Sequence, residues 1–188
     1  MRIGAPKALL QYAKNESFLH HLAGIFSAAG CEVLAVLGHQ AERIEASHPD
    51  VRTIRNARWR EGQLSSARLG LAAALDAGAG CVLIHPVDMP TLAVPTVRAL
   101  IAQVPEDRAL VPFLGDQPGH PLVLSRGCGE AILRDSAPTL EAAIKSIGIV
   151  PVAVEDRGVT SNINTAEDYQ RAFGRPPRLA ELAGGSGQ

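Results

Sequence analysis

The sequence predicts an α/β protein in which helices cover a mostly parallel β-sheet that includes one antiparallel strand. Apolar segments of strand length alternate with segments whose apolar residues recur at helical spacing. The run Cys81–Ile84 is continuously apolar, which is typical of a strand buried on both faces of a parallel sheet. The connection from Phe113 to Leu122 is too short for a helical crossover, so these two strands are expected to run antiparallel or to diverge at an edge.

The elements of the first half follow from apolar spacing and from turn residues. Residues 15–29 are predicted to be a helix, because Phe18, Leu22 and Ile25 recur at helical spacing and Gly30 can terminate it. The elements expected next are a strand at 32–37, a short helix ending at 46, a strand at 51–55, a polar loop at 56–66 and a helix ending at 75.

Prolines delimit several elements of the second half. Pro86 and Pro90 close the strand 81–84, and Pro95 favours the start of a helix. Pro151 suggests that the last strand lies at an edge or bends. The expected strands are 81–84, 109–113, 122–124 and 149–154, and the expected helices are 94–104, 127–133, 139–147 and one that follows Asn164.

Length and composition indicate a single domain at residues 1–173, followed by a Gly-, Pro- and Ala-rich tail at 174–188. The 46 % of hydrophobic residues suffices for a sizeable core, and the net charge of -1 argues against nucleic-acid or membrane partners attracted by bulk charge. There is no apolar run long enough to cross a bilayer and no signal-peptide core. The three cysteines have no zinc-ligand spacing, and Cys31 and Cys81 open apolar runs, so we expect buried free thiols in a reducing cytoplasm.

Asp88 is the first candidate for a functional residue. It follows the apolar strand 81–84 directly, and ligands of open parallel sheets bind outside the carboxyl ends of the strands. A carboxylate at that place can hold a hard cation such as Mg²⁺ together with substrate phosphates. The alternative is that Asp88 caps the next helix or forms an Asx turn, and spacing alone gives the two interpretations similar weight.

Other polar positions have both a functional and a structural interpretation. Gly4 and Lys7 could surround a phosphate, although a solvated N-terminal lysine is more common. The loop 56–66 could bind a nucleotide or be an ordinary capped loop. His120 could order its loop or touch a phosphorylated substrate. Asn164 or Thr165, paired with Glu167, could cap a helix, or Asn164 could ligate the cation held by Asp88.

Taken together, these segments resemble the MobA/MocA-type nucleotidyltransferases over about residues 2–173. Residues 2–7 resemble the end of the family's Gly-rich loop L-A-A/G-G-x-S-x-R-M-G-x-x-K. Four further segments match family motifs in the same order: 56–66 for N-x-x-W-x-x-G-x-x-x-S, 87–90 for D-x-P, 119–121 for G-H-P and 162–168 for D-I-D-T-P-E-D.

The resemblance implies a three-layer Rossmann-like nucleotidyltransferase fold and transfer of a nucleoside monophosphate from CTP or GTP, CMP being favoured over GMP, to a molybdopterin-type acceptor. Such a transfer needs positioning and charge neutralisation rather than a protein nucleophile. A molybdoenzyme or a maturation factor is an expected partner. The implied roles are Mg²⁺ ligands (Asp88, Asn164), triphosphate neutralisation (Arg2, Lys7), contacts to nucleotide or phosphate (Gly4, Asn56, Gly62, Ser65, Ser66) and a contact to the acceptor (His120).

Two departures from the family pattern affect these expectations. The family's first strand and the opening of its loop would precede Met1, so we expect that strand to be missing, most simply because the start is placed too late. A repacked sheet or a poorly stable relic are the alternatives. Asn162 and Asn164 stand where aspartate is usual, which weakens metal binding. Two other functions therefore remain open: the same chemistry on a sugar or polyol phosphate, and a non-catalytic nucleotide-binding module.

Overall fold

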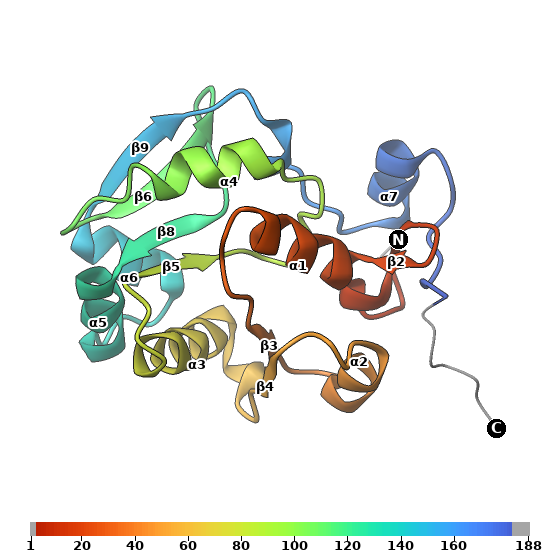
Figure 1. The fold of residues 1–188 in the computed structure, drawn as a ribbon, viewed down its shortest axis with the longest axis horizontal. Helices are drawn as coiled ribbons and strands as arrows, with labels where there is room; N and C mark the ends of the chain where they lie inside the picture. Colours follow the sequence, from red (N-terminus) through yellow and green to blue (C-terminus); the bar gives the residue numbers. More distant parts are fainter. Residues whose placement is uncertain (1–2, 182–188) are drawn as a thin grey trace.

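The computed structural model describes residues 3–181, and its main sheet is mixed (Figure 1). This sheet contains β5 (Cys81–Ile84), β8 (Leu122–Ser125), β6 (Ala109–Leu114), β7 (Gln117–Pro118) and β9 (Ile149–Ala153). β5 and β6 pair antiparallel with β8, whereas β9 pairs parallel with β6. β5, β6 and β9 therefore share one direction, and β8 and the short β7 oppose it. The predicted α/β class is confirmed, with two antiparallel strands in place of the one expected.

Helices form a layer on each face of this sheet. α1 (Phe18–Ala28) and α4 (Val94–Ile101) contact one another on one face. α3 (Gln63–Asp76), α5 (Arg126–Arg134) and α6 (Leu140–Ile147) contact one another on the other face. The molecule thus has the three layers expected of a Rossmann-like fold.

Alternating side chains of the sheet supply the two cores. Leu110 and Val123 are fully buried in a cluster with Leu100 of α4. Leu124, the next residue of β8, is buried in the opposite cluster with Leu71 of α3. This alternation is what the two-residue period of a strand requires when both faces are covered.

A second, two-stranded sheet lies apart from the main one. β3 (Ala35–Leu37) pairs parallel with β4 (Thr53–Arg55), and among residues 3–181 no strand pairs with the other edge of either β3 or β5. The helices nevertheless span both sheets: Leu19 of α1 packs with Leu37, and Leu22 of the same helix packs with Leu83. The sheet is therefore interrupted between β3 and β5 under shared helical cover.

This interruption corrects one expectation about β5. The sequence predicts a strand buried on both faces, but all four residues of Cys81–Ile84 are only half-buried. The apolar run has the composition of a central strand, and β8 pairs with just one of its edges. Its solvent exposure follows from the missing neighbour and not from the residues themselves.

The N-terminal segment differs from the prediction at the helix start. The expected helix at 15–29 begins only at Phe18, because β1 (Gln11–Ala13) and β2 (Glu16–Ser17) form a hairpin before it. Asn15 has a left-handed backbone with φ of 61°, which suits the turn between the strands. Ser17 then caps α1 by accepting a hydrogen bond from the backbone N–H of His20 at 3.2 Å.

The remaining elements are short. They are η1 (Lys7–Leu9), α2 (Ala41–Ser47), η2 (Trp59–Glu61), η3 (Arg157–Val159) and α7 (Ala166–Phe173). The predicted helix 94–104 ends earlier, at Ile101, because the next three residues form a turn before β6. None of the helices within residues 3–181 combines the length and the apolar character needed to cross a membrane.

Part of the predicted tail packs against the N-terminal segment. The backbone N–H of Gln11 donates to Arg178 O at 2.9 Å, and Ala180 N–H donates to Leu9 O at 2.9 Å. Residues 182–188, where the tail is expected to become ragged, lie outside the described residues. Cys31, Cys81 and Cys128 are free thiols, as expected, but only Cys128 is buried, whereas Cys31 and Cys81 are half-buried.

Candidate active site at the carboxyl end of strand β5

Asp88 lies in the tight loop that follows β5. The loop is anchored by Met89, which is 2 % exposed, and by the carbonyl of Asp88, which accepts a hydrogen bond from Ile163 N–H at 2.8 Å. The Asp88 side chain keeps 23 % of its surface exposed. Asp88 therefore presents its carboxylate from a fixed backbone.

The ammonium of Lys7 joins Asp88 to Asn164. Lys7 Nζ donates to Asp88 Oδ2 at 2.8 Å and to Asn164 Oδ1 at 2.5 Å. These three residues come from η1, from the loop after β5 and from the residue two positions before α7. The structure thus brings together Lys7 and both predicted metal ligands, although 157 positions separate Lys7 from Asn164.

The N-terminus of α7 fixes the backbone of Asn164. Thr165 is the N-cap, and its hydroxyl accepts from Asp168 N–H while Asp168 Oδ2 accepts from Thr165 N–H, which forms a capping box. Asp168 Oδ2 also accepts from Asn164 N–H at 3.1 Å. The capping pair expected from the sequence was Asn164 or Thr165 with Glu167, and the partner is instead Asp168, the residue at the third helical position.

The capping box also stabilises the charged form of the Asp168 side chain. Hydrogen bonds from Thr165, the backbone N–H first among them, lower the pKa of Asp168. Asp168 is therefore a carboxylate at neutral pH, and its Oδ2 accepts from the backbone N–H groups of both Asn164 and Thr165. The amide oxygen of Asn164 remains free to face Lys7.

Asp88 lines a polar hollow of about 330 Å³. The other residues around the hollow come from the start of α3, the loop before β8 and the segment after η3. They are Gln63, Pro86, Met89, Pro118, Gly119, His120, Thr160 and Asn162. Gln63 and Thr160 are not among the predicted site residues. For Gln63 the available signal was its place as the first residue of a helix beside a polar loop.

His120 enters the hollow from a closely packed loop. A Cβ at Gly119 would lie 2.3 Å from Val159 O, so only glycine fits before His120. The backbone N–H of His120 donates to the same Val159 carbonyl at 2.8 Å. Burial lowers the pKa of His120, so the imidazole is neutral at pH 7. Its Nδ1 lies 3.4 Å from Ile84 O, a group that can only accept, so the proton is assigned to Nδ1 and Nε2 is an acceptor.

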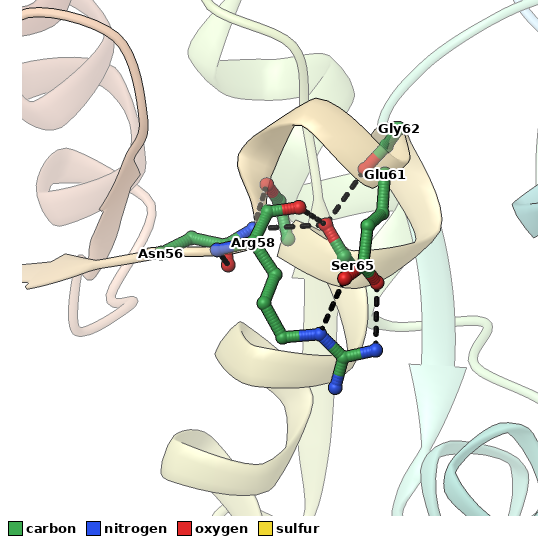
Figure 2. A network of polar contacts seen from close by, with 6 residues as sticks. Asn56, Arg58, Glu61, Gly62 and Ser65 are labelled. Carbon is green, nitrogen blue, oxygen red and sulfur yellow. Dashed lines mark hydrogen bonds and ion pairs between the residues drawn. The ribbon is translucent and has the colours of Figure 1, made fainter.

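Asn56, Ser65 and Ser66 form a hydrogen-bonded group of their own at the start of α3. Figure 2 shows Asn56 and Ser65 of this group. Asn56 is 6 % exposed, and its Nδ2 donates to both serine hydroxyls at 2.9 Å. Its Oδ1 accepts from Arg58 N–H at 2.9 Å. The amide of Asn56 is therefore satisfied within the protein, which matches the capped-loop interpretation of this segment.

Gly62 and its neighbours complete the same loop. Ser65 Oγ contacts Gly62 O at 2.9 Å, and Gly62 adopts φ of 104°, a conformation that favours glycine (Figure 2). Arg58 pairs with Glu61 through two hydrogen bonds of 2.8 and 2.6 Å. The backbone of Gly62 directly precedes Gln63, which lines the hollow. The loop thus adjoins the site without presenting the Asn56 side chain to it.

Two predicted residues lie elsewhere or cannot be placed. Gly4 lines a separate and mostly apolar hollow of about 280 Å³, together with Leu10, Ala166 and Leu179. Arg2 lies outside the described residues. The described phosphate-binding candidate near Asp88 is therefore Lys7.

The donor set at Asp88 fits a hard divalent cation that is shared with a substrate. A carboxylate and an amide oxygen converge on one position that a cation already occupies, the Lys7 ammonium. Residues 3–181 contain no group of three or more His, Cys, Asp or Glu side chains that could hold a metal. Phosphate oxygens would have to complete the coordination, as they do for Mg²⁺ in nucleotide-dependent enzymes.

Comparison with known proteins identifies the chain as a nucleotidyltransferase. The model of the family described as "MobA-like NTP transferase domain" matches residues 1–147. The chain belongs to this family. Asn164 and α7 lie beyond the matched residues, whereas Lys7, Asp88 and His120 lie within them.

Individual relatives agree with this assignment. The chain is 26 % identical over 141 residues to the molybdenum cofactor cytidylyltransferase of Escherichia coli, covering 73 % of this chain and 71 % of that protein. A crystal structure of Rv0371c from Mycobacterium tuberculosis is 25 % identical, with a TM-score of 0.76 and coverage of 93 % and 92 %.

Two further solved structures bear on the metal and on the fold. A complex of Rv0371c with manganese aligns with a TM-score of 0.70 at 25 % identity, covering 92 % of this chain and 94 % of that one. The molybdopterin-guanine dinucleotide biosynthesis protein A of Archaeoglobus fulgidus has a TM-score of 0.68 at 18 % identity, covering 92 % and 91 %, which shows the shared fold alone.

Proposed function

We propose that this protein is a Mg²⁺-dependent cytidylyltransferase that transfers CMP from CTP to the phosphate of a molybdopterin-type acceptor. The observation that carries the proposal is the convergence of Asp88, Asn164 and Lys7 on one point beside a polar hollow. The similarity to a molybdenum cofactor cytidylyltransferase supports the choice of nucleotide and acceptor. The manganese complex of Rv0371c supports the use of a divalent ion.

In the proposed reaction an oxygen of the acceptor phosphate attacks the α-phosphorus of CTP. The bond between the α-phosphorus and the oxygen bridging to the β-phosphorus breaks, and pyrophosphate leaves with that bond's electron pair. Two anions must approach one another, so the protein has to position them and to offset their repulsion. A bound Mg²⁺ supplies the charge that offsets this repulsion.

The described residues divide this task among themselves. Asp88 and Asn164 would hold the Mg²⁺ through their side-chain oxygens, and Lys7 would neutralise the triphosphate. His120 faces the acceptor, to which its neutral ring offers an acceptor nitrogen for an N–H or O–H group. The backbone of Gly62 and the hydroxyl of Ser66 border the nucleotide at the start of α3.

The test of this proposal is pyrophosphate release with CTP, Mg²⁺ and molybdopterin-type acceptor. The wild-type protein is expected to release pyrophosphate faster with CTP than with GTP. Asp88→Asn should lower the rate by about a hundredfold or more, because it removes the one carboxylate at the metal position. Asp116→Asn, in the exposed turn between β6 and β7, is the matched control and should have no effect.

A panel of acceptors distinguishes transfer to a molybdopterin-type acceptor from the same transfer to a sugar or polyol phosphate. Sugar and polyol phosphates replace the molybdopterin acceptor under the same conditions. Faster pyrophosphate release with one of these phosphates would support the same nucleotidyl transfer but identify a different acceptor. Absence of pyrophosphate release with every acceptor, or undiminished release by Asp88→Asn, would contradict the proposal.

A further inference from the structure

Lys7 occupies the position at which a metal would meet Asp88 and Asn164. Its ammonium lies 2.8 Å from the carboxylate oxygen and 2.5 Å from the amide oxygen. A lysine ammonium is a compact point charge that donates hydrogen bonds to oxygen atoms. Such a group satisfies the same two oxygens that a divalent cation would use, so lysine and metal cannot both occupy this position.

The Lys7 side chain can move while its backbone stays in place. The three residues after it, Ala8, Leu9 and Leu10, are at most 6 % exposed, and Leu10 N–H donates to Lys7 O at 3.0 Å. The side chain itself is 28 % exposed, and its ammonium is carried on a flexible chain of four carbons. The ammonium can therefore leave the two oxygens without any change in the core beneath η1.

We propose that Lys7 is a placeholder for the metal: it holds Asp88 and Asn164 together in the free protein and moves to the phosphates when the metal arrives with the nucleotide. This inference rests on the proposed function and adds to it the order of binding, in which the metal binds together with the nucleotide. The metal alone must displace an ion pair and binds weakly. The metal–nucleotide complex offers Lys7 new anionic partners and binds strongly.

Lys7→Met is an informative variant, because it should change metal affinity in opposite directions without and with nucleotide. Without nucleotide, loss of the ammonium frees Asp88 and removes a positive charge from the metal position, so metal should bind more tightly. With nucleotide, loss of the same ammonium removes a phosphate partner, so the metal–nucleotide complex should bind less tightly. A residue with a purely structural role would weaken both.

The experiment measures Mn²⁺ affinity by electron paramagnetic resonance, with and without a non-hydrolysable CTP analogue. Lys7→Met and Lys7→Gln should lower the dissociation constant for Mn²⁺ alone by about threefold to tenfold. Both variants should raise the dissociation constant in the presence of the analogue. Lys14→Met, in the exposed hairpin turn, is the matched control and should leave both constants unchanged.

Asp88→Asn separates failure of this inference from failure of the proposed function. If Asp88→Asn weakens Mn²⁺ binding with the analogue but Lys7→Met and Lys7→Gln do not strengthen binding of Mn²⁺ alone, the placeholder role is wrong and the metal site stands. If Asp88→Asn leaves Mn²⁺ binding with the analogue unchanged, both the metal site and the placeholder role are wrong.

Discussion

The position of the Asp88 carboxylate is fixed by residues that hold the backbone around it. Its carbonyl is paired with Ile163 N–H, and the adjoining Met89 is buried. The same hydrogen bond brings the segment that contains Asn164 next to the loop after β5. A carboxylate in an Asx turn would be turned towards its own backbone, whereas the Asp88 side chain contacts Lys7. The structure thus argues against the Asx-turn interpretation, and the role of Asp88 as a metal ligand stays a prediction.

His85 is a second residue whose surroundings determine its chemistry. Its Nε2 lies 2.9 Å from Met89 O, and within the described part of the chain its buried Nδ1 has no hydrogen-bond partner. Burial lowers the pKa of His85 to about 4. The unfolded chain takes up this proton near pH 6.5, so the folded state loses stability as the pH falls from about 6.5 towards 4.

The pH dependence of stability tests this consequence. Between pH 7 and pH 5 the free energy of unfolding from urea titrations should fall, with His85 contributing up to about 2 kcal/mol of the loss. His85→Gln keeps a donor for Met89 O and cannot titrate, so it should reduce the difference between the two pH values. His39→Gln, at an exposed position, should leave the difference intact. An unchanged difference in His85→Gln would contradict the assigned cause.

At the scale of elements, the N-terminus of α7 couples helix stability to the site. Thr165 and Asp168 close the first turn, and Asp168 also binds the backbone of Asn164. α6 offers a comparison, because Thr139 caps it in the same way by accepting from Ala142 N–H at 3.1 Å. The two caps differ in that only the cap of α7 adjoins a side chain that contacts Lys7.

Replacing each cap by alanine distinguishes stability from positioning. Thr165→Ala and Thr139→Ala should each lower the free energy of unfolding by about 1 kcal/mol. Thr165→Ala should also lower the rate of pyrophosphate release by at least about tenfold, because Asn164 loses its fixed backbone. Thermal unfolding and initial rates measure the two effects. Equal rates for the two variants would show that the cap has no part in the site.

The elements also show which features the sequence can predict. The strand Cys81–Ile84 is predicted with its observed bounds, because its composition and flanking turn residues agree. The hairpin at Gln11–Ser17 is missed, because its strands of three and two residues are too short to show an apolar alternation. Local spacing placed Asp88 and Asn164 at element ends, but only tertiary packing shows that Lys7 joins them.

At the scale of the whole molecule, the interrupted sheet leaves part of β5 unpaired. Gly80 O accepts from Arg126 N–H at 2.9 Å, and Cys81 lies opposite Ser125. Antiparallel pairs alternate, so the backbone groups of Val82 and Ile84 face β8, and those of Cys81 and Leu83 face the open edge. The sequence could not predict the exposure of this strand, because its residues have the composition of a central one.

Amide hydrogen exchange tests this pairing residue by residue. The amides of Val82 and Ile84 should exchange about a hundredfold or more slowly than those of Cys81 and Leu83. Exchange followed by two-dimensional NMR resolves the four amides. Equal protection of all four would mean that the second edge of β5 is paired in solution, contrary to the structure.

The proposed function requires a single metal position shared by Asp88 and Asn164, and crystallography with anomalous scattering tests this position most directly. Crystals grown with Mn²⁺ and a non-hydrolysable CTP analogue should show an anomalous peak within about 2.3 Å of a side-chain oxygen of each residue. Lys7 Nζ should then contact the phosphates. A manganese peak away from Asp88 would contradict the shared metal position, and a Lys7 ammonium still joining Asp88 to Asn164 beside bound nucleotide would contradict the movement of Lys7.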